Sequence, residues 1–166
     1  MQFPSIPQVR VGIGQASHRF LPADSTKPCT IAGLIFEDAP GLLDTSDGDV
    51  VFHAICNAIT SVSGVPILRG IAADLCLKGG ITDSQVYLEK ALETLGAQRM
   101  EHIALTIEGK RPLLFDRIEE MRLKIAKILH IRVDQVGLTA TSGEGLTDFG
   151  CGDGLLCFCV ITTIKS

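Results

Sequence analysis

The chain has 166 residues, of which 46% are hydrophobic and 20% charged, and its formal net charge is −4 at pH 7. Because a nucleic-acid surface must neutralise phosphates with a basic patch, this balance argues against a nucleic-acid partner. No apolar run reaches the length of a membrane span, and the start of the chain does not resemble a signal peptide. We therefore expect a cytoplasmic protein without a membrane partner, forming a single domain over residues 1–166.

Cysteine and glycine usage indicate the redox state and the assembly. The six cysteines form no CxxC pair, which favours buried reduced thiols over disulfides. With 17 glycines, no tryptophan and a mean hydropathy of +0.32, the chain has more apolar surface than a small monomer usually hides. This composition favours an oligomer.

The first elements are an arm, a strand and a glycine-rich segment. Residues 1–7 are expected to form a loose arm, and the alternation over residues 8–14 predicts a first strand. Just beyond that strand, the sequence GIGQASHR at residues 12–19 places small residues and His18 where backbone can approach a ligand closely. Residues 29–36 then predict a second strand or ribbon.

The segment SDGDVVFH at residues 46–53 predicts a helix that begins at Ser46, because Ser46 and Asp49 have the spacing of a capping box. Asp49, His53 and Asn57 recur every four residues and share one face of this helix. Two interpretations of His53 are open: a half-buried histidine satisfied by Asp49 and Asn57, or a metal ligand.

The second half of the chain predicts a short helix, two longer helices and three strands. Residues 64–80 have no clear period and predict a mobile loop with a short helix near 71–77. Thr82 and Gln85 form a second capping box, for a helix that ends near Gly96. Spacing predicts the other elements: a strand over 102–107, a helix over 113–129, and strands over 136–140 and 155–164.

This order of elements predicts an α/β fold, more specifically an α+β two-layer sandwich. A mixed sheet would carry helices on one face, and its other face would be free to pack in a dimer or trimer. Cys157 and Cys159 lie two residues apart on the last strand, so they should face the same side and pack there.

His18 and His53 come from different elements and can converge on one metal if the fold brings them together. Imidazole pairs suit zinc, and an open site would leave a position for a substrate oxygen. We expect His102, at a strand start, and His130, at a helix end, to be structural or surface residues.

Four motifs together resemble the 2-C-methyl-D-erythritol 2,4-cyclodiphosphate synthase family over almost the whole chain. They are GxGxxxHR at 12–19, SDGDVxxHA at 46–54, TSGEGL at 141–146 and GxGxG at 150–154, of which SDGDVxxHA is the most specific. The resemblance implies a zinc-dependent homotrimer with active sites between subunits. It also implies an isoprenoid-pathway reaction, in which 4-diphosphocytidyl-2-C-methyl-D-erythritol 2-phosphate is converted to the cyclic diphosphate with release of CMP.

The resemblance assigns roles to particular positions. His18 and His53 match histidine zinc ligands, and Glu144 matches a glutamate near a second cation, Mg²⁺ or Mn²⁺. Thr45 and Ser142 occupy the catalytic positions. At the position of Ser142, the family has a threonine that stabilises the transition state. The implied substrate-binding positions are Ala16, Ser17, His18, Thr45, Ser46, Asp74, Lys110, Arg111, Ala140, Thr141, Ser142, Gly143, Glu144, Asp148 and Cys151.

The chain also departs from the family pattern. Ala16 stands where the family has an aspartate as third zinc ligand, and a methyl group cannot bind metal, so we expect weak zinc binding and slow turnover that aspartate would restore. Alternatively, a divergent site recruits another ligand, such as Asp44 or water. The other departures are Thr45 in place of histidine or asparagine, Cys151 in place of arginine, Asp148 in place of an apolar residue, and a 67–76 segment that retains only Asp74.

Two other functions are compatible with the sequence. One is a cytidine-nucleotide-binding trimer without turnover, in which the segment around Glu144 holds a phosphate. The other is a zinc hydrolase that uses His18 and His53 and releases a linear product.

Overall fold

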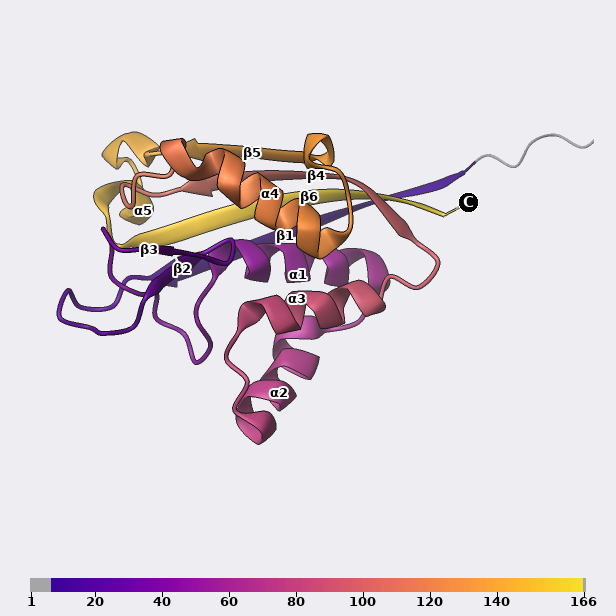
Figure 1. The fold of residues 1–166 in the computed structure, drawn as a ribbon, viewed down its shortest axis with the longest axis horizontal. Helices are drawn as coiled ribbons and strands as arrows, with labels where there is room; N and C mark the ends of the chain where they lie inside the picture. Colours follow the sequence, from indigo (N-terminus) through magenta and orange to yellow (C-terminus); the bar gives the residue numbers. More distant parts are fainter. Residues whose placement is uncertain (1–6, 166) are drawn as a thin grey trace, which may run out of the picture.

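The computed structural model describes residues 7–165 and contains a four-stranded sheet in the order β1-β6-β4-β5 (Figure 1). β6 pairs antiparallel with both β1 and β4, while β4 and β5 are parallel, so the sheet is mixed, as predicted. The strands are β1 (Gln8–Arg19), β4 (Arg99–Glu108), β5 (Val136–Thr141) and β6 (Gly154–Lys165). A separate hairpin of β2 (Cys29–Ile31) and β3 (Leu34–Phe36) forms the predicted ribbon.

The helices lie mainly on one side of this sheet, and α2 projects furthest from it (Figure 1). They are α1 (Val50–Ser63), α2 (Ala72–Gly79), α3 (Ser84–Glu93), α4 (Ile118–Leu129) and the short α5 (Asp148–Cys151). A π-helical turn (Ile67–Ile71) precedes α2, and 3₁₀ turns cover Phe115–Arg117, Val133–Gln135 and Gly143–Gly145.

Two glycines let α1 pack directly on β1. A Cβ on Gly14 would lie 2.1 Å from the carbonyl oxygen of Ala54, and one on Gly12 would lie 2.3 Å from that of Ala58. Only hydrogen fits at these positions, so the helix backbone approaches the strand closely. This contact brings the first turns of α1 beside the C-terminal end of β1.

The opposite face of β1 and β6 is apolar and uncovered in the single chain. Val9, Val11 and Ile13 are 56%, 64% and 62% exposed, and Ile13 pairs with the exposed Val160 of β6. Side chains alternate across a strand, so these residues share one face, while Cys157 and Cys159 are both buried on the other, as predicted.

Two boundaries near the N-terminus differ from the prediction. β1 continues to Arg19, so GIGQASHR lies within the strand and not beyond it. The first helix begins at Val50, because Asp49 is its N-cap and accepts from the Val51 and Phe52 N–H groups. The predicted capping box at Ser46 is therefore wrong. Asp49, which that prediction placed in the first turn of the helix, is itself the N-cap.

Further corrections concern the segment after α1 and the next two helices. The 64–80 segment is mostly helical rather than a mobile loop: the short helix expected near 71–77 is present as α2, and the π-helical turn precedes it. Asp83, not Thr82, caps α3 by accepting from the Gln85 N–H, and the helix ends at Glu93 rather than near Gly96. α4 begins at Ile118, after a 3₁₀ turn, rather than at Leu113.

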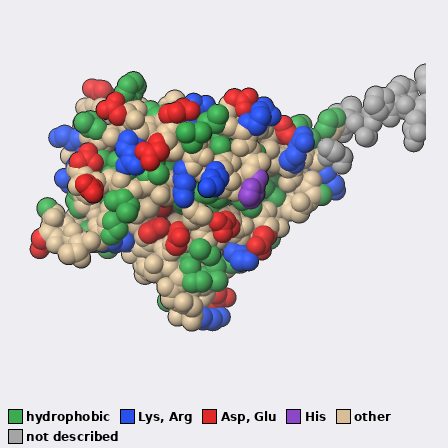
Figure 2. Space-filling view, viewed as in Figure 1, with side chains coloured by type: hydrophobic (Ala, Val, Ile, Leu, Met, Phe, Trp, Pro, Cys, Tyr) green, Lys and Arg blue, Asp and Glu red, His purple; other side chains and the backbone are tan. Residues whose placement is uncertain are grey.

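No single helix within residues 7–165 is long and apolar enough to cross a membrane. By length and composition, α1 and the helical segment through Gly79 pass that test only as a pair bent by 112°, and most of α1 is buried in the core. Acidic and basic side chains are interspersed over the face that carries α3 and α4 (Figure 2), so this face has no dominant sign of charge.

Candidate metal and substrate site

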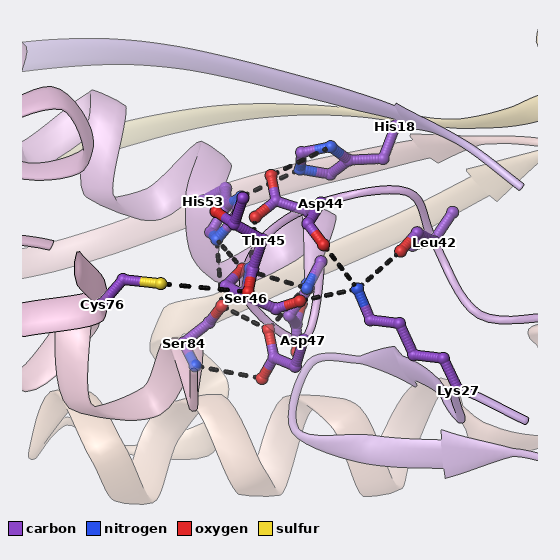
Figure 3. A network of polar contacts seen from close by, with 12 residues as sticks. His18, Lys27, Leu42, Asp44, Thr45, Ser46, Asp47, His53, Cys76 and Ser84 are labelled. Carbon is purple, nitrogen blue, oxygen red and sulfur yellow. Dashed lines mark hydrogen bonds and ion pairs between the residues drawn. The ribbon is translucent and has the colours of Figure 1, made fainter. Parts of the chain in front are cut away.

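The structure brings together the two histidines that the sequence singled out. His18, near the end of β1, places its Nε2 atom 2.9 Å from Nδ1 of His53, on the first turn of α1. The two rings meet edge to face, with centroids 5.0 Å apart (Figure 3). Two imidazole nitrogens from distant parts of the chain thus face one another.

Asp44 adds a carboxylate to this pair. Its Oδ2 atom lies 3.6 Å from His18 Nδ1, and one potential ligand atom from each of His18, Asp44 and His53 lies within 4.8 Å of the others. Two imidazole nitrogens and one carboxylate oxygen form a ligand set typical of catalytic zinc, with a fourth position left for water or substrate. The donor chemistry of this cluster therefore fits a divalent metal.

Lys27 holds the loop that carries Asp44. Its Nζ donates to the carbonyl oxygens of Leu42, Asp44 and Ser46 at 2.8, 3.0 and 2.6 Å, which uses all three hydrogens of the ammonium group. The Ser46 N–H also donates to Asp44 Oδ1 at 2.7 Å. These bonds fix the Asp44 backbone and one carboxylate oxygen beside the histidines (Figure 3).

Asp49 and Asn57 do not satisfy His53, so that interpretation of the helix face is wrong. The fully buried Asp49 carboxylate accepts from the N–H groups of Ala32 and Gly33 in the β2–β3 turn, and from two N–H groups of α1. Asn57 donates to the Gln15 carbonyl of β1 at 2.8 Å. Both residues join α1 to its neighbours, and His53 takes other partners.

The second ring nitrogen of His53 faces two hydroxyl groups. Its Nε2 lies 2.9 Å from Ser84 Oγ, at the start of α3, and 3.3 Å from Ser46 Oγ. Ser84 in turn bonds to the Asp47 carboxylate through both its hydroxyl and its N–H group. Sequence reasoning missed Ser84 and Asp47; only Ser84's position beside a helix cap hinted at a polar role.

Burial and neighbouring charges set the protonation of the cluster. Burial, together with the charge of His18, lowers the pKa of His53 to about 4. Burial also lowers the pKa of His18, against the opposing effect of Asp44. Although burial alone would raise the pKa of Asp44, hydrogen bonds from Ser46 and the nearby histidines hold it below its usual value. At neutral pH both rings are therefore uncharged, with lone pairs available to a metal.

The cluster lies in a pocket of about 550 Å³ between β1, α1 and α2. Ala16 lines this pocket on the same face of β1 as His18, and Ser17, Thr45 and Ser46 also line it. Side chains missed by sequence reasoning complete the wall, among them Arg69, Cys76 and Tyr87. Asp74 of α2 is not among the lining residues and pairs with Lys78 at 2.9 Å.

The other predicted site residues gather at the adjoining ends of β4, β5 and α5. Thr141 pairs with Glu108, the Lys110 N–H donates to the Phe149 carbonyl, and Arg111 reaches the Gly152 carbonyl. Of this group, Asp148 lines a second pocket, of about 230 Å³, together with Ser17 and His18. The residues outside the 550 Å³ pocket are Lys110, Arg111, Ala140, Thr141, Ser142, Gly143, Glu144, Asp148 and Cys151. Like them, the exposed His102 and His130 lie outside it.

Comparison with known proteins identifies the family. Residues 9–164 match the YgbB family. The chain belongs to the YgbB family. Curated relatives named 2-C-methyl-D-erythritol 2,4-cyclodiphosphate synthase include those of Chlamydia caviae and Chlamydia felis, 57% and 55% identical over 157 residues. These alignments cover 94% of this chain and 89% of each relative, so the resemblance read from the motifs is confirmed.

Solved structures agree with this YgbB assignment. A structure of 2C-methyl-D-erythritol-2,4-cyclodiphosphate synthase has a TM-score of 0.82 and 26% identity, covering 93% of this chain and 99% of that one. The IspF–CDP complex of Plasmodium falciparum has a TM-score of 0.80, at 21% identity, over 98% of this chain and 99% of that one. The mixed α/β fold with its mixed sheet is thus the fold of these proteins, and the chain belongs to a family of cyclodiphosphate synthases.

Proposed function

We propose that this chain converts 4-diphosphocytidyl-2-C-methyl-D-erythritol 2-phosphate to 2-C-methyl-D-erythritol 2,4-cyclodiphosphate and CMP in the cytoplasm, as a zinc-dependent phosphorus–oxygen lyase of non-mevalonate isoprenoid biosynthesis. The observation that carries the proposal is that His18 Nε2 lies 2.9 Å from His53 Nδ1, beside Asp44 and inside a pocket of about 550 Å³. Kinship with curated synthases at 55–57% identity supports the reaction class.

In the proposed reaction, an oxygen of the 2-phosphate bonds to the β-phosphorus, and the bond from that phosphorus to the oxygen leading to CMP breaks. Such a transfer depends on positioning and on neutralising charge rather than on covalent catalysis. A divalent metal held by the histidines would polarise the β-phosphate and neutralise its charge. Thr45 and Ser46 line the pocket beside these ligands and would orient the phosphate oxygens.

We propose Asp44 as the carboxylate ligand that Ala16 does not provide. Asp44 is anionic, lies within ligand distance of both histidines and is held there through Lys27. The competing proposal, expected from the sequence, is that Ala16 leaves the metal without a third protein ligand and so lowers activity. Ala16 lines the same pocket, so an aspartate introduced there would reach the same space.

We further propose that the group around Ser142 completes the pocket of another copy in a homotrimer. Ser142 and Glu144 lie outside the histidine pocket of their own chain, and the uncovered apolar face of β1 and β6 offers a surface for assembly. There, Ser142 would steady the transition state, and Glu144 would hold Mg²⁺ or Mn²⁺ at the diphosphate. The other residues of this group would bind the cytidine nucleotide.

Phosphorus NMR of the reaction mixture tests the function. The proposal expects the cyclic diphosphate and CMP in equal amounts, and a His53→Ala variant should form neither. A linear product would instead support a zinc hydrolase. Metal-independent CMP binding without any turnover would support the nucleotide-binding trimer, and either result would overturn the synthase proposal.

Zinc content and competition titration test the third ligand. We expect Asp44→Ala to lower zinc affinity about 10- to 100-fold, and the double variant Ala16→Asp/Asp44→Ala to regain it. The single variant Ala16→Asp should change affinity little. If Asp44→Ala binds zinc like the parent while Ala16→Asp binds much more tightly, then the competing proposal, that Ala16 weakens zinc binding, is correct and Asp44 is not a ligand.

A further inference from the structure

A series of hydrogen bonds runs from the metal cluster into the protein through the side chains of His53, Ser84 and Asp47. Ser84 is fully buried, and its Oγ lies 2.9 Å from His53 Nε2 and within hydrogen-bond distance of Asp47 Oδ1. Asp47 Oδ2 accepts the Ser84 N–H at 3.0 Å, and Oδ1 accepts the Asp49 N–H at 3.0 Å. The links join α3, the loop before α1, and α1 itself (Figure 3).

The available hydrogens determine which group donates in each of these hydrogen bonds. A carboxylate only accepts hydrogen bonds, so the single hydrogen of the Ser84 hydroxyl must point toward Asp47. The Ser84 oxygen can then only accept from His53, which requires the hydrogen of the ring to be on Nε2.

The neighbouring Ser46 does not reverse this direction. Its Oγ accepts the Gly48 N–H at 3.1 Å and lies 3.3 Å from His53 Nε2, farther than Ser84 Oγ. An N–H at Nε2 can be shared between the two hydroxyl oxygens. Ser46 alone could donate or accept, so it does not decide where the ring hydrogen is.

We infer that Asp47 and Ser84 are positioning residues that keep the hydrogen of His53 on Nε2 and so present the Nδ1 lone pair to the metal. Nδ1 is the atom that faces His18 Nε2. A metal-binding histidine is generally oriented by a hydrogen bond at its other nitrogen, and Ser84 supplies that bond through Asp47. The inference rests on the proposed function only in taking His53 as a metal ligand.

Nitrogen-15 NMR of histidine-labelled, metal-free protein tests the assignment directly, at about pH 8, where the neutral ring shows which nitrogen carries hydrogen. We expect the Nε2–H form for His53 in the parent and in Ser84→Thr, which keeps the hydroxyl. Ser84→Ala should give a mixture of both tautomers and an about 10- to 100-fold loss of zinc affinity. Ser46→Ala should keep the parent tautomer.

Three outcomes would overturn the inference: a parent His53 with its hydrogen on Nδ1, a Ser84→Ala variant with unchanged tautomer and zinc affinity, or a loss in Ser84→Thr equal to that in Ser84→Ala. The tautomer measurement needs neither zinc nor substrate. A parent that shows the Nε2–H form but no synthase activity would therefore contradict the proposed function and leave this inference standing.

Discussion

At the scale of single residues, the site depends on keeping two adjacent imidazoles uncharged. His53 is buried against His18, so protonating either ring costs desolvation, and protonating both adds repulsion. Asp44 offsets part of this cost for His18. The cluster therefore offers lone pairs to a metal at a pH where exposed histidines begin to protonate.

The lowered pKa of His53 makes the stability of the metal-free protein depend on pH. Its pKa falls from 6.5 to about 4 on folding, so the unfolded chain binds the proton more readily within that window. The contribution of His53 to the free energy of unfolding should be fully present above pH 6.5 and should fall by about 3 kcal/mol as the pH drops toward 4. Urea unfolding at several pH values measures the effect.

Two variants provide the controls for this pH dependence. His53→Gln should remove the contribution of this ring, so the variant should lose less stability than the parent as the pH drops through that window, and His130→Asn, at an exposed helix end, is the control substitution. An equally steep profile in His53→Gln would contradict the prediction.

At the scale of elements, the site depends on how closely α1 packs on β1. Gly12 and Gly14 remove the side chains that would separate the two backbones, and Asn57 bonds to the Gln15 carbonyl across the contact. Asp49 joins the same helix to the β2–β3 turn. His18 and His53 meet because these contacts fix the helix against the strand.

A methyl group at Gly14 should therefore harm both stability and metal binding. Gly14→Ala places its Cβ 2.1 Å from the Ala54 oxygen and must push the helix away, at a cost of about 3 kcal/mol. Zinc affinity should fall in parallel as His53 moves from His18. Denaturant unfolding and zinc titration measure the two effects.

Gly64→Ala is the matched control for this close contact. That residue ends α1 at φ +75° with no atom within 4 Å of a new Cβ, so only backbone strain of about 1 kcal/mol is expected, with unchanged zinc affinity. Equal losses in the two variants would contradict the role given to the close contact.

At the scale of the whole molecule, the uncovered strip on β1 and β6 predicts self-association. Val9, Val11 and Ile13 lie on one sheet face with Val160, and large contiguous apolar patches on monomers generally mark interfaces. The helices cover the opposite face, so assembly through this strip would leave the histidine pocket accessible.

Charge introduced into the strip should break the assembly. Ile13→Lys, at a residue 62% exposed in the single chain, should shift the molar mass measured by light scattering from trimer toward monomer. Leu123→Lys, on α4 at 54% exposure, is the control and should keep the parent mass. A monomeric parent, or an Ile13→Lys variant of unchanged mass, would contradict the homotrimer.

Much of this protein could be predicted from the sequence, because the relevant signals are local. Periodicity predicted the main strands and three helices within a few residues, and the motifs around His18 and His53 identified the family and two of the three cluster residues. The errors at Ser46 and Thr82 have one cause: several neighbouring residues can cap a helix, and only backbone geometry selects Asp49 and Asp83.

Tertiary structure decided what the sequence left open at the site. Lys27 and Ser84 have no spacing that links them to the histidines, and they reach the cluster because α1, α3 and two loops pack against the end of β1. Ala16 in the sequence predicts a missing ligand, with Asp44 or water as alternatives, and only the three-dimensional structure places the Asp44 carboxylate beside both histidines. The sequence by itself determined the residue types and the family, whereas packing determined which side chains share a pocket, since contacts between distant residues leave no local pattern.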